Sequence, residues 1–164
     1  MPTSADTTPR FDPLAAILAL AFPGAGHWFL GERKRAILIA SGVLGLFLTG
    51  LLIGGIDVVD SKEDRWWFVG QALVGPVAFG TDYLHQHRIK GIDPQTGALR
   101  SANPDEARDE SGRLVPALGG QHPPASKSLG KMNELGTLFA CIAGMMNLIV
   151  ALDAAFPGRR EEKA

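Results

Sequence analysis

Residues 36–56, AILIASGVLGLFLTGLLIGGI, contain no Asp, Glu, Lys or Arg, and their only polar side chains are Ser41 and Thr49. A helix of about 21 residues, rising about 1.5 Å per residue, spans the ~30 Å hydrocarbon core of a bilayer. The outer face of a water-soluble amphipathic helix carries charges, and this segment carries none. It is therefore predicted to be a membrane-spanning helix.

Three other blocks have the same character. The 16 basic and 17 acidic residues of the chain all lie outside residues 13–31, 36–56, 66–81 and 135–152. We therefore predict an all-α integral membrane protein with about four transmembrane helices. The expected spans are 13–31, 36–56, 66–84 and 133–156, between a disordered tail at 1–12 and a charged tail at 157–164.

The first block, PLAAILALAFPGAGHWFLG, is interrupted by Pro23, Gly24 and Gly26. An interior proline removes a backbone hydrogen bond and clashes with the preceding turn, so we expect a kinked or broken helix there. If the block is a re-entrant hairpin, only three spans cross the membrane. A signal peptide cleaved after residues 19–21, ALA, is a further alternative.

Residues 85–132 are polar and rich in turn-forming residues, which predicts a long, largely irregular extramembrane loop. Asn103-Pro104-Asp105-Glu106 within it has the pattern of a helix start, so we expect one short helix there. Gly119-Gly120 and Pro123-Pro124 indicate that the remainder is a linker.

The charge distribution bears on orientation and partners. With four spans, the basic turn at 33–35 shares a side with the 85–132 loop, and this side has more Lys and Arg than the other. It is therefore predicted to be cytoplasmic, with both termini outside. A net charge of −1 gives no reason to expect nucleic acid as a partner, and the single cysteine, Cys141, excludes an internal disulfide.

Polar and small residues form stripes on the third and fourth blocks, at the spacing of one helix face. The third-block stripe is Gln71, Gly75, Ala78 and Asp82, and the fourth-block stripe is Gly136, Ala140, Gly144, Asn147 and Ala151. Small residues let helices approach closely, so these faces are predicted to pack together. Gln71 and Asn147 are then expected to form interhelical hydrogen bonds.

Three other polar residues lie near the ends of the apolar blocks. Asp82 and Asp153 are placed to reach the membrane surface as solvated caps, and His27 is placed for an interfacial hydrogen bond. An alternative use of Asp82 is a metal site with His85 and His87, to which His122 could add a ligand.

Residues 23–31, PGAGHWFLG, resemble the Pro-Gly-x-Gly-(Gln/His)-x-(Phe/Tyr)-x-Gly turn of small bacterial membrane hairpins. They are also similar to the two-transmembrane-segment hairpin domain, with one aromatic residue fewer between His27 and Leu30. Residues 133–153 resemble part of an uncharacterised bacterial multi-pass membrane family, a domain of unknown function. These resemblances imply a membrane location and bring no activity. In the last span they draw attention to Asn133, Glu134, Asn147 and Asp153.

We expect a non-enzymatic, multi-pass protein of the bacterial inner membrane, a structural or interaction component that contacts lipid and packs with itself or with a membrane complex. The chain has no catalytic or phosphate-binding motif, and no cofactor is expected. One alternative is a small transporter or channel-like subunit, and a second is a metal-binding membrane protein. Transport requires the polar stripes to face a wet cavity, whereas packing requires them to make dry contacts.

Overall fold

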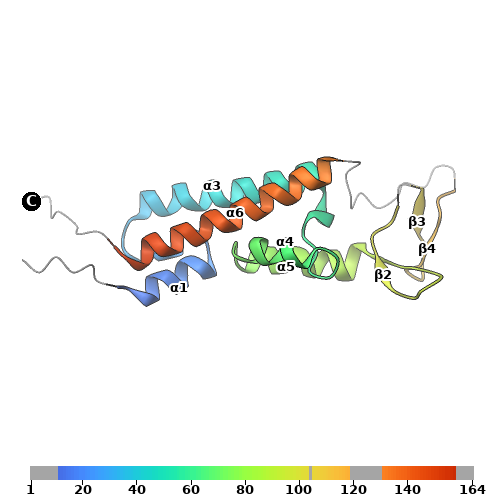
Figure 1. Ribbon diagram of the computed structural model, residues 1–164, viewed down its shortest axis with the longest axis horizontal. Helices are drawn as coiled ribbons and strands as arrows, with labels where there is room; N and C mark the ends of the chain where they lie inside the picture. The colour runs from blue at the N-terminus through green and yellow to red at the C-terminus, as the bar shows by residue number, and fades with distance from the viewer. Residues whose placement is uncertain (1–10, 104, 119–130, 158–164) are drawn as a thin grey trace, which may run out of the picture.

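Two long helices form the centre of the molecule (Figure 1). In the computed structural model, which describes residues 11–103, 105–118 and 131–157, α3 (Arg33–Gly54) and α6 (Lys131–Ala155) lie side by side and run antiparallel. Glycines bring them into close contact, because a Cβ added at Gly136 would lie 2.6 Å from the carbonyl oxygen of Gly50. The small residues of α6 therefore serve as a helix-packing surface.

The first apolar block forms a hairpin of two short helices. α1 (Pro13–Ala21) begins after Asp12, whose carboxylate caps its first turn, and it ends before Pro23. α2 (Ala25–Phe29) follows Gly24, whose φ of 84° is one that residues with a side chain rarely adopt. The break lies where the proline and glycines predicted it.

The third apolar block is also divided, into α4 (Arg65–Ala72) and α5 (Pro76–Leu84). The chain turns between them at Gly75, whose φ is 94°, and the two helices pack against each other through Phe68 and Phe79. A proline is well suited to the first turn of a helix, where its missing N–H costs nothing. One continuous helix over 66–84 was expected, and the Gly-Pro pair replaces it by two.

Among the described residues, α3 and α6 are the two helices long and apolar enough to cross a membrane. They contain 22 and 25 residues. The other two apolar blocks are each divided between shorter helices, so the count of four spans stays a prediction.

The two hairpins meet beside the middle of α6. Asn147, which is fully buried, donates from Nδ2 to the carbonyl oxygens of Ala19 at 3.0 Å and Leu73 at 2.8 Å. These carbonyls lie at the ends of α1 and α4, where a helix leaves its last C=O groups without intrahelical partners. One side-chain amide therefore satisfies the backbone where both helices are broken.

Residues 85–118 form a small polar module beyond one end of the helices (Figure 1). η2 (His85–Ile89) continues α5 into this module. Two antiparallel strand pairs follow: β1 (Gly91–Ile92) with β2 (Leu99–Arg100), and β3 (Glu106–Arg108) with β4 (Leu114–Pro116). Short strands of two or three residues therefore stand within the loop that was predicted to be largely irregular, while the linker predicted at 119–124 lies outside the described residues.

The helix expected to start at Asn103 does not form. The guanidinium of Arg100 binds both carboxylate oxygens of Glu106, at 2.6 and 2.7 Å. Glu106 also accepts the N–H of Asn103 at 3.0 Å, as a glutamate does in a helix capping box. Because Arg100 holds the carboxylate against β2, the chain continues as strand β3 and not as a helix.

Candidate functional site

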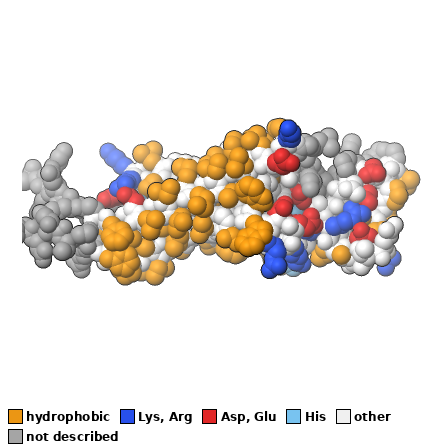
Figure 2. Space-filling view, in the orientation of Figure 1, with side chains coloured by type: hydrophobic (Ala, Val, Ile, Leu, Met, Phe, Trp, Pro, Cys, Tyr) orange, Lys and Arg blue, Asp and Glu red, His pale blue; other side chains and the backbone are white. Residues whose placement is uncertain are grey.

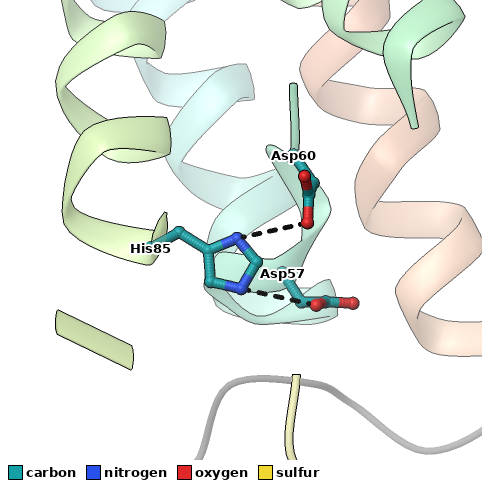
Figure 3. Close-up of side chains that lie close together, drawn as sticks. All are labelled: Asp57, Asp60 and His85. Carbon is teal, nitrogen blue, oxygen red and sulfur yellow. Dashed lines mark ion pairs between the residues drawn. The ribbon is translucent and has the colours of Figure 1, made fainter. Parts of the chain in front are cut away.

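A cluster of buried polar side chains lies where the helices end and the module begins (Figure 3). Asp57 and Asp60 come from the segment after α3, and His85 comes from the start of η2. The imidazole lies between the two carboxylates, with Nε2 3.4 Å from Asp57 Oδ1 and Nδ1 3.8 Å from Asp60 Oδ2. All three side chains are at most 5% exposed, so their polar groups must find partners inside the protein.

The chain after α3 positions these two carboxylates. Gly55, with a φ of 87°, ends α3 and leads into η1 (Ile56–Val58). Val58 and Val59 pack into the hydrophobic core, which draws the flanking acids inside with them. Asp60 then accepts the backbone N–H groups of the two residues at 62 and 63, at 2.8 and 3.0 Å, in an Asx turn.

Lys90 supplies the positive charge of the cluster. Its side chain is 0% exposed, and Nζ lies 2.5 Å from Asp60 Oδ2 and 2.8 Å from Glu63 Oε1. Burial opposes the charged form of both Lys90 and Asp60, but their ion pair outweighs it. The pKa of Asp60 lies below its ordinary value and the pKa of Lys90 lies above its own. Both groups are therefore ionised around neutral pH.

Two further side chains connect this cluster to the module and to α6. Ser101 donates its hydroxyl proton to Asp57 and lies 3.3 Å from His85 Nε2. Asn133 donates from Nδ2 to the carbonyl oxygen of Gly54 at 3.1 Å and to Asp57 Oδ2 at 3.5 Å. Because the hydroxyl of Ser101 is directed at Asp57, the arrangement differs from a serine nucleophile activated by a histidine.

The cluster also has the donor set of a cation site. Asp57, Asp60 and His85 each offer one ligand atom, and these atoms all lie within 4.8 Å of one another. Carboxylate oxygens and an imidazole nitrogen suit borderline divalent cations such as Zn²⁺ and Mn²⁺. The ammonium group of Lys90 already neutralises Asp60, so a cation would have to displace it.

The predicted metal ligands do not all come together. Asp82 accepts the backbone N–H and the hydroxyl of Ser61, at 2.9 and 2.7 Å. His87 is exposed and stacks on Tyr83, with ring centroids 4.2 Å apart. His85 alone of the three lies in the cluster, and His122 lies outside the described residues.

The two aspartates of the cluster were missed by sequence reasoning. They stand in the segment IDVVDS, residues 56–61, where two acids flank a pair of valines. An apolar pair inside a charged turn is a sign that the turn is partly buried, and this signal could have found them.

A second polar contact lies at the opposite end of the helices. His27 of α2 is 1% exposed, and its Nε2 lies 2.7 Å from Asp153 Oδ2 of α6. Arg35, in the first turn of α3, binds the same oxygen at 2.6 Å. His27 and Asp153, both expected near a membrane surface, therefore join three helices at this end.

The remaining candidates contact the backbone or solvent. Gln71, fully buried in α4, donates from Nε2 to the carbonyl oxygen of Val58 at 2.8 Å. Glu134 is exposed and borders, with Asn133, a cavity of ≈ 430 Å³ at the start of α6. Gln71, like Asn147 at the junction of the hairpins, thus directs its amide at backbone carbonyl groups.

The fold and its polar contacts define a mostly helical protein with two helices that are long and apolar enough to cross a membrane. The chain belongs to the family of unknown function DUF6677, whose sequence pattern matches residues 14–163. The expectation of an uncharacterised family is thereby confirmed.

One curated relative is a D-amino acid dehydrogenase of Rhodopseudomonas palustris (strain HaA2). It is 30% identical over 79 residues, which make up 48% of this chain and 19% of that protein. The chain thus spans about a fifth of the length of this relative, and the likeness brings no activity to it. No solved structure matches the chain.

Proposed function

We propose that this chain is an integral membrane protein that serves as a structural or interaction component, with α3 and α6 crossing the bilayer. The observation that carries the proposal is the exposure of these apolar helices. In the most apolar stretch of each helix, only 22% of α3 and 39% of α6 is buried. The core helix of a water-soluble protein is mostly buried, so these surfaces call for apolar surroundings.

Exposed apolar side chains cover the helices between two charged ends (Figure 2). The most exposed include Leu38 at 71%, Leu52 at 86% and Ile149 at 66%. Trp28 is exposed beside Arg33 at the start of α3, and Trp66 is exposed in the first turn of α4, which follows the segment that leaves the other end of α3. Tryptophans at both ends of an apolar belt are typical of anchors at the two membrane surfaces.

The buried amides favour packing over transport. Gln71 and Asn147 are both 0% exposed, and their Nε2 and Nδ2 groups donate to backbone carbonyls of neighbouring segments. Side chains that line a polar conduit would direct these groups at water. Their use between helices supports a structural role.

The two divided blocks fit re-entrant hairpins that enter the membrane from opposite faces. The first hairpin, from the start of α1 to the end of α2, begins and ends near the contact between Arg35 and Asp153. The second hairpin, from the start of α4 to the end of α5, begins and ends beside the polar cluster (Figure 1). Irregular backbone is tolerated at membrane depth only where protein covers it. This arrangement places the basic turn at 33–35 beside the two ends of the described chain, so the orientation derived from four spans no longer follows.

Cysteine labelling in sealed membrane vesicles tests this topology. In a Cys141→Ala background, single cysteines replace Lys34, Lys62 or Ser111, and an impermeant reagent is applied to one side. We expect Lys62→Cys and Ser111→Cys to react from the same side and Lys34→Cys from the other. Four spans would group Lys34 with Ser111. Release of the whole chain by alkaline carbonate would overturn the membrane proposal itself.

A second candidate function is the binding of a divalent cation, favoured by the 4.8 Å grouping of Asp57, Asp60 and His85. Isothermal titration of the detergent-solubilised full chain with Mn²⁺ or Zn²⁺ tests it. Binding should be lost in His85→Ala and kept in His87→Ala, the matched control. Equal heats from both variants would rule this site out.

A further inference from the structure

A groove lies on the apolar face between α1, α2 and the start of α3. Its volume is ≈ 530 Å³, and its lining includes Leu18, Phe22, Trp28, Ala36 and Ala40. The groove results from the break in the first apolar block, because α1 ends at Ala21 and α2 has only five residues. The first turns of α3 are therefore left partly uncovered.

Exposed basic charge stands at one end of this groove. The guanidinium carbon of Arg33 lies 5.7 Å from the ring centre of Trp28, which lines the groove. Arg35 is engaged by Glu32 and Asp153. Arg33 and Lys34 are exposed, and neither forms an ion pair with a carboxylate of the part of the chain that the structure describes.

We propose that this groove binds one anionic phospholipid. The phosphate contacts Arg33 and Lys34, and one acyl chain lies along Trp28 and Ala40. The inference rests on the proposed membrane location. An apolar groove that ends in a basic rim matches a molecule with an apolar chain and a negative head.

Charge favours this occupant over a second copy of the chain. A two-fold symmetric contact through the groove would bring the Arg33 and Lys34 of both copies together, and like charges repel. The headgroup of an anionic lipid has the opposite sign. Each basic residue near the surface is expected to contribute about fivefold to its affinity.

Tryptophan fluorescence provides the test, because the chain has three tryptophans and the other two, Trp66 and Trp67, belong to α4 and do not line the groove. In a Trp66→Phe/Trp67→Phe chain, Trp28 is the only reporter. The full-length protein in neutral detergent is titrated with phosphatidylglycerol or phosphatidylcholine whose acyl chains carry bromine, which quenches a tryptophan in contact with it. Half-maximal quenching should need about 25-fold less of the anionic lipid, because each of the two basic residues contributes about fivefold.

Two pairs of variants separate the headgroup contact from the acyl-chain contact. Arg33→Gln/Lys34→Gln should make the two lipids equal, while Lys62→Gln/Arg65→Gln, which removes the same charge at the other end, should keep the preference. Ala40→Leu fills the groove and should weaken quenching by both lipids. Ser41→Leu, at the next position of α3 and outside the groove, should leave quenching unchanged.

Three results would overturn the proposal. Equal quenching by both lipids in the parent chain would mean ordinary annular lipid. Quenching that Ala40→Leu leaves unchanged would place the lipid elsewhere. A dimer mass by light scattering, with Trp28 shielded from both lipids, would assign the groove to a second copy. Failure of the membrane proposal can be told apart from failure of the lipid proposal, because alkaline carbonate would then release the chain from membrane vesicles.

Discussion

Lys90 Nζ lies 2.5 Å from Asp60 Oδ2, and neither side chain is more than 1% exposed. Lys90 stands where the polar module begins, and Asp60 stands in the turn after α3. Gln86 adds a 2.8 Å hydrogen bond to the same carboxylate. The module is therefore attached to the helices through a buried charge pair, which is costly to break on one side only.

Replacing Lys90 with Met should destabilise this attachment strongly. The variant leaves the Asp60 carboxylate buried without its counter-ion, and removal of one partner of a buried ion pair costs about 3–5 kcal/mol. Adding Asp60→Asn should restore part of the loss, because a neutral amide needs no counter-ion. Thermal unfolding of the four chains of this cycle in detergent gives the coupling energy.

The control for that cycle is Arg88→Met, which removes an exposed positive charge from the same helical turn. It should leave the unfolding temperature nearly unchanged. If the stability loss of the double variant equals the sum of the losses of Lys90→Met and Asp60→Asn, the two side chains do not interact directly.

The strand pairs should resist acid because of Glu106. Arg100 binds its carboxylate at both oxygens and, with the N–H of Asn103, lowers the pKa of Glu106 from 4.5 to about 2. A depressed pKa adds stability that is fully present above pH 4.5 and is lost as the pH falls through about 2. Protection against hydrogen exchange in residues 99–116, measured relative to an unstructured chain at the same pH, should therefore stay high at pH 4 and fall below pH 3.

Glu106→Gln removes the titrating carboxyl group. Residues 99–116 of this variant should exchange faster at pH 5, and their protection should change less as the pH falls. Glu110→Gln, an exposed change in the same module, serves as the control. An unchanged acid profile in Glu106→Gln would show that the pair with Arg100 does not stabilise the strands.

Gly144 should be the most sensitive glycine of α6. A Cβ at this position would collide with the carbonyl oxygen of Gly70 in α4, so Gly144→Ala must push the helices apart at a cost of about 1–3 kcal/mol. Gly45→Ala on α3 is the matched control, since a Cβ there meets no atom within 4 Å and alanine favours the helix. Melting curves in detergent should separate the two variants, and equal shifts would mean that α4 and α6 pack loosely.

Helices α3 and α6 could be predicted because a long run without charges is a property of the local sequence. The break at Pro23 was predictable for the same reason. The break at Gly75–Pro76 uses the same two residue types, and the apolar length of the block concealed it. What no local pattern encodes is that both breaks meet at Asn147.

The polar cluster was harder to predict because its residues are buried only by tertiary contacts. Asp57 and Asp60 stand in a turn whose composition is that of a solvated segment. They become buried because the valines between them enter the core and because the chain returns with His85 and Lys90 after the α4–α5 hairpin. The spacing of Asp82, His85 and His87 suggested a shared metal site, but these side chains contact different neighbours.

Replacing Asn147 with Leu tests whether its amide holds the tips of the two hairpins. Asn147 donates to the carbonyl oxygens of Ala19 and Leu73, and Leu would leave both oxygens without this partner. The loss should be about 1–3 kcal/mol, as for buried polar groups that are left unpaired. Unfolding in detergent measures it, with Met146→Leu, an exposed neighbour on α6, as the control. If the two variants are equally stable, the amide does not stabilise the breaks, and the re-entrant arrangement loses its main structural support.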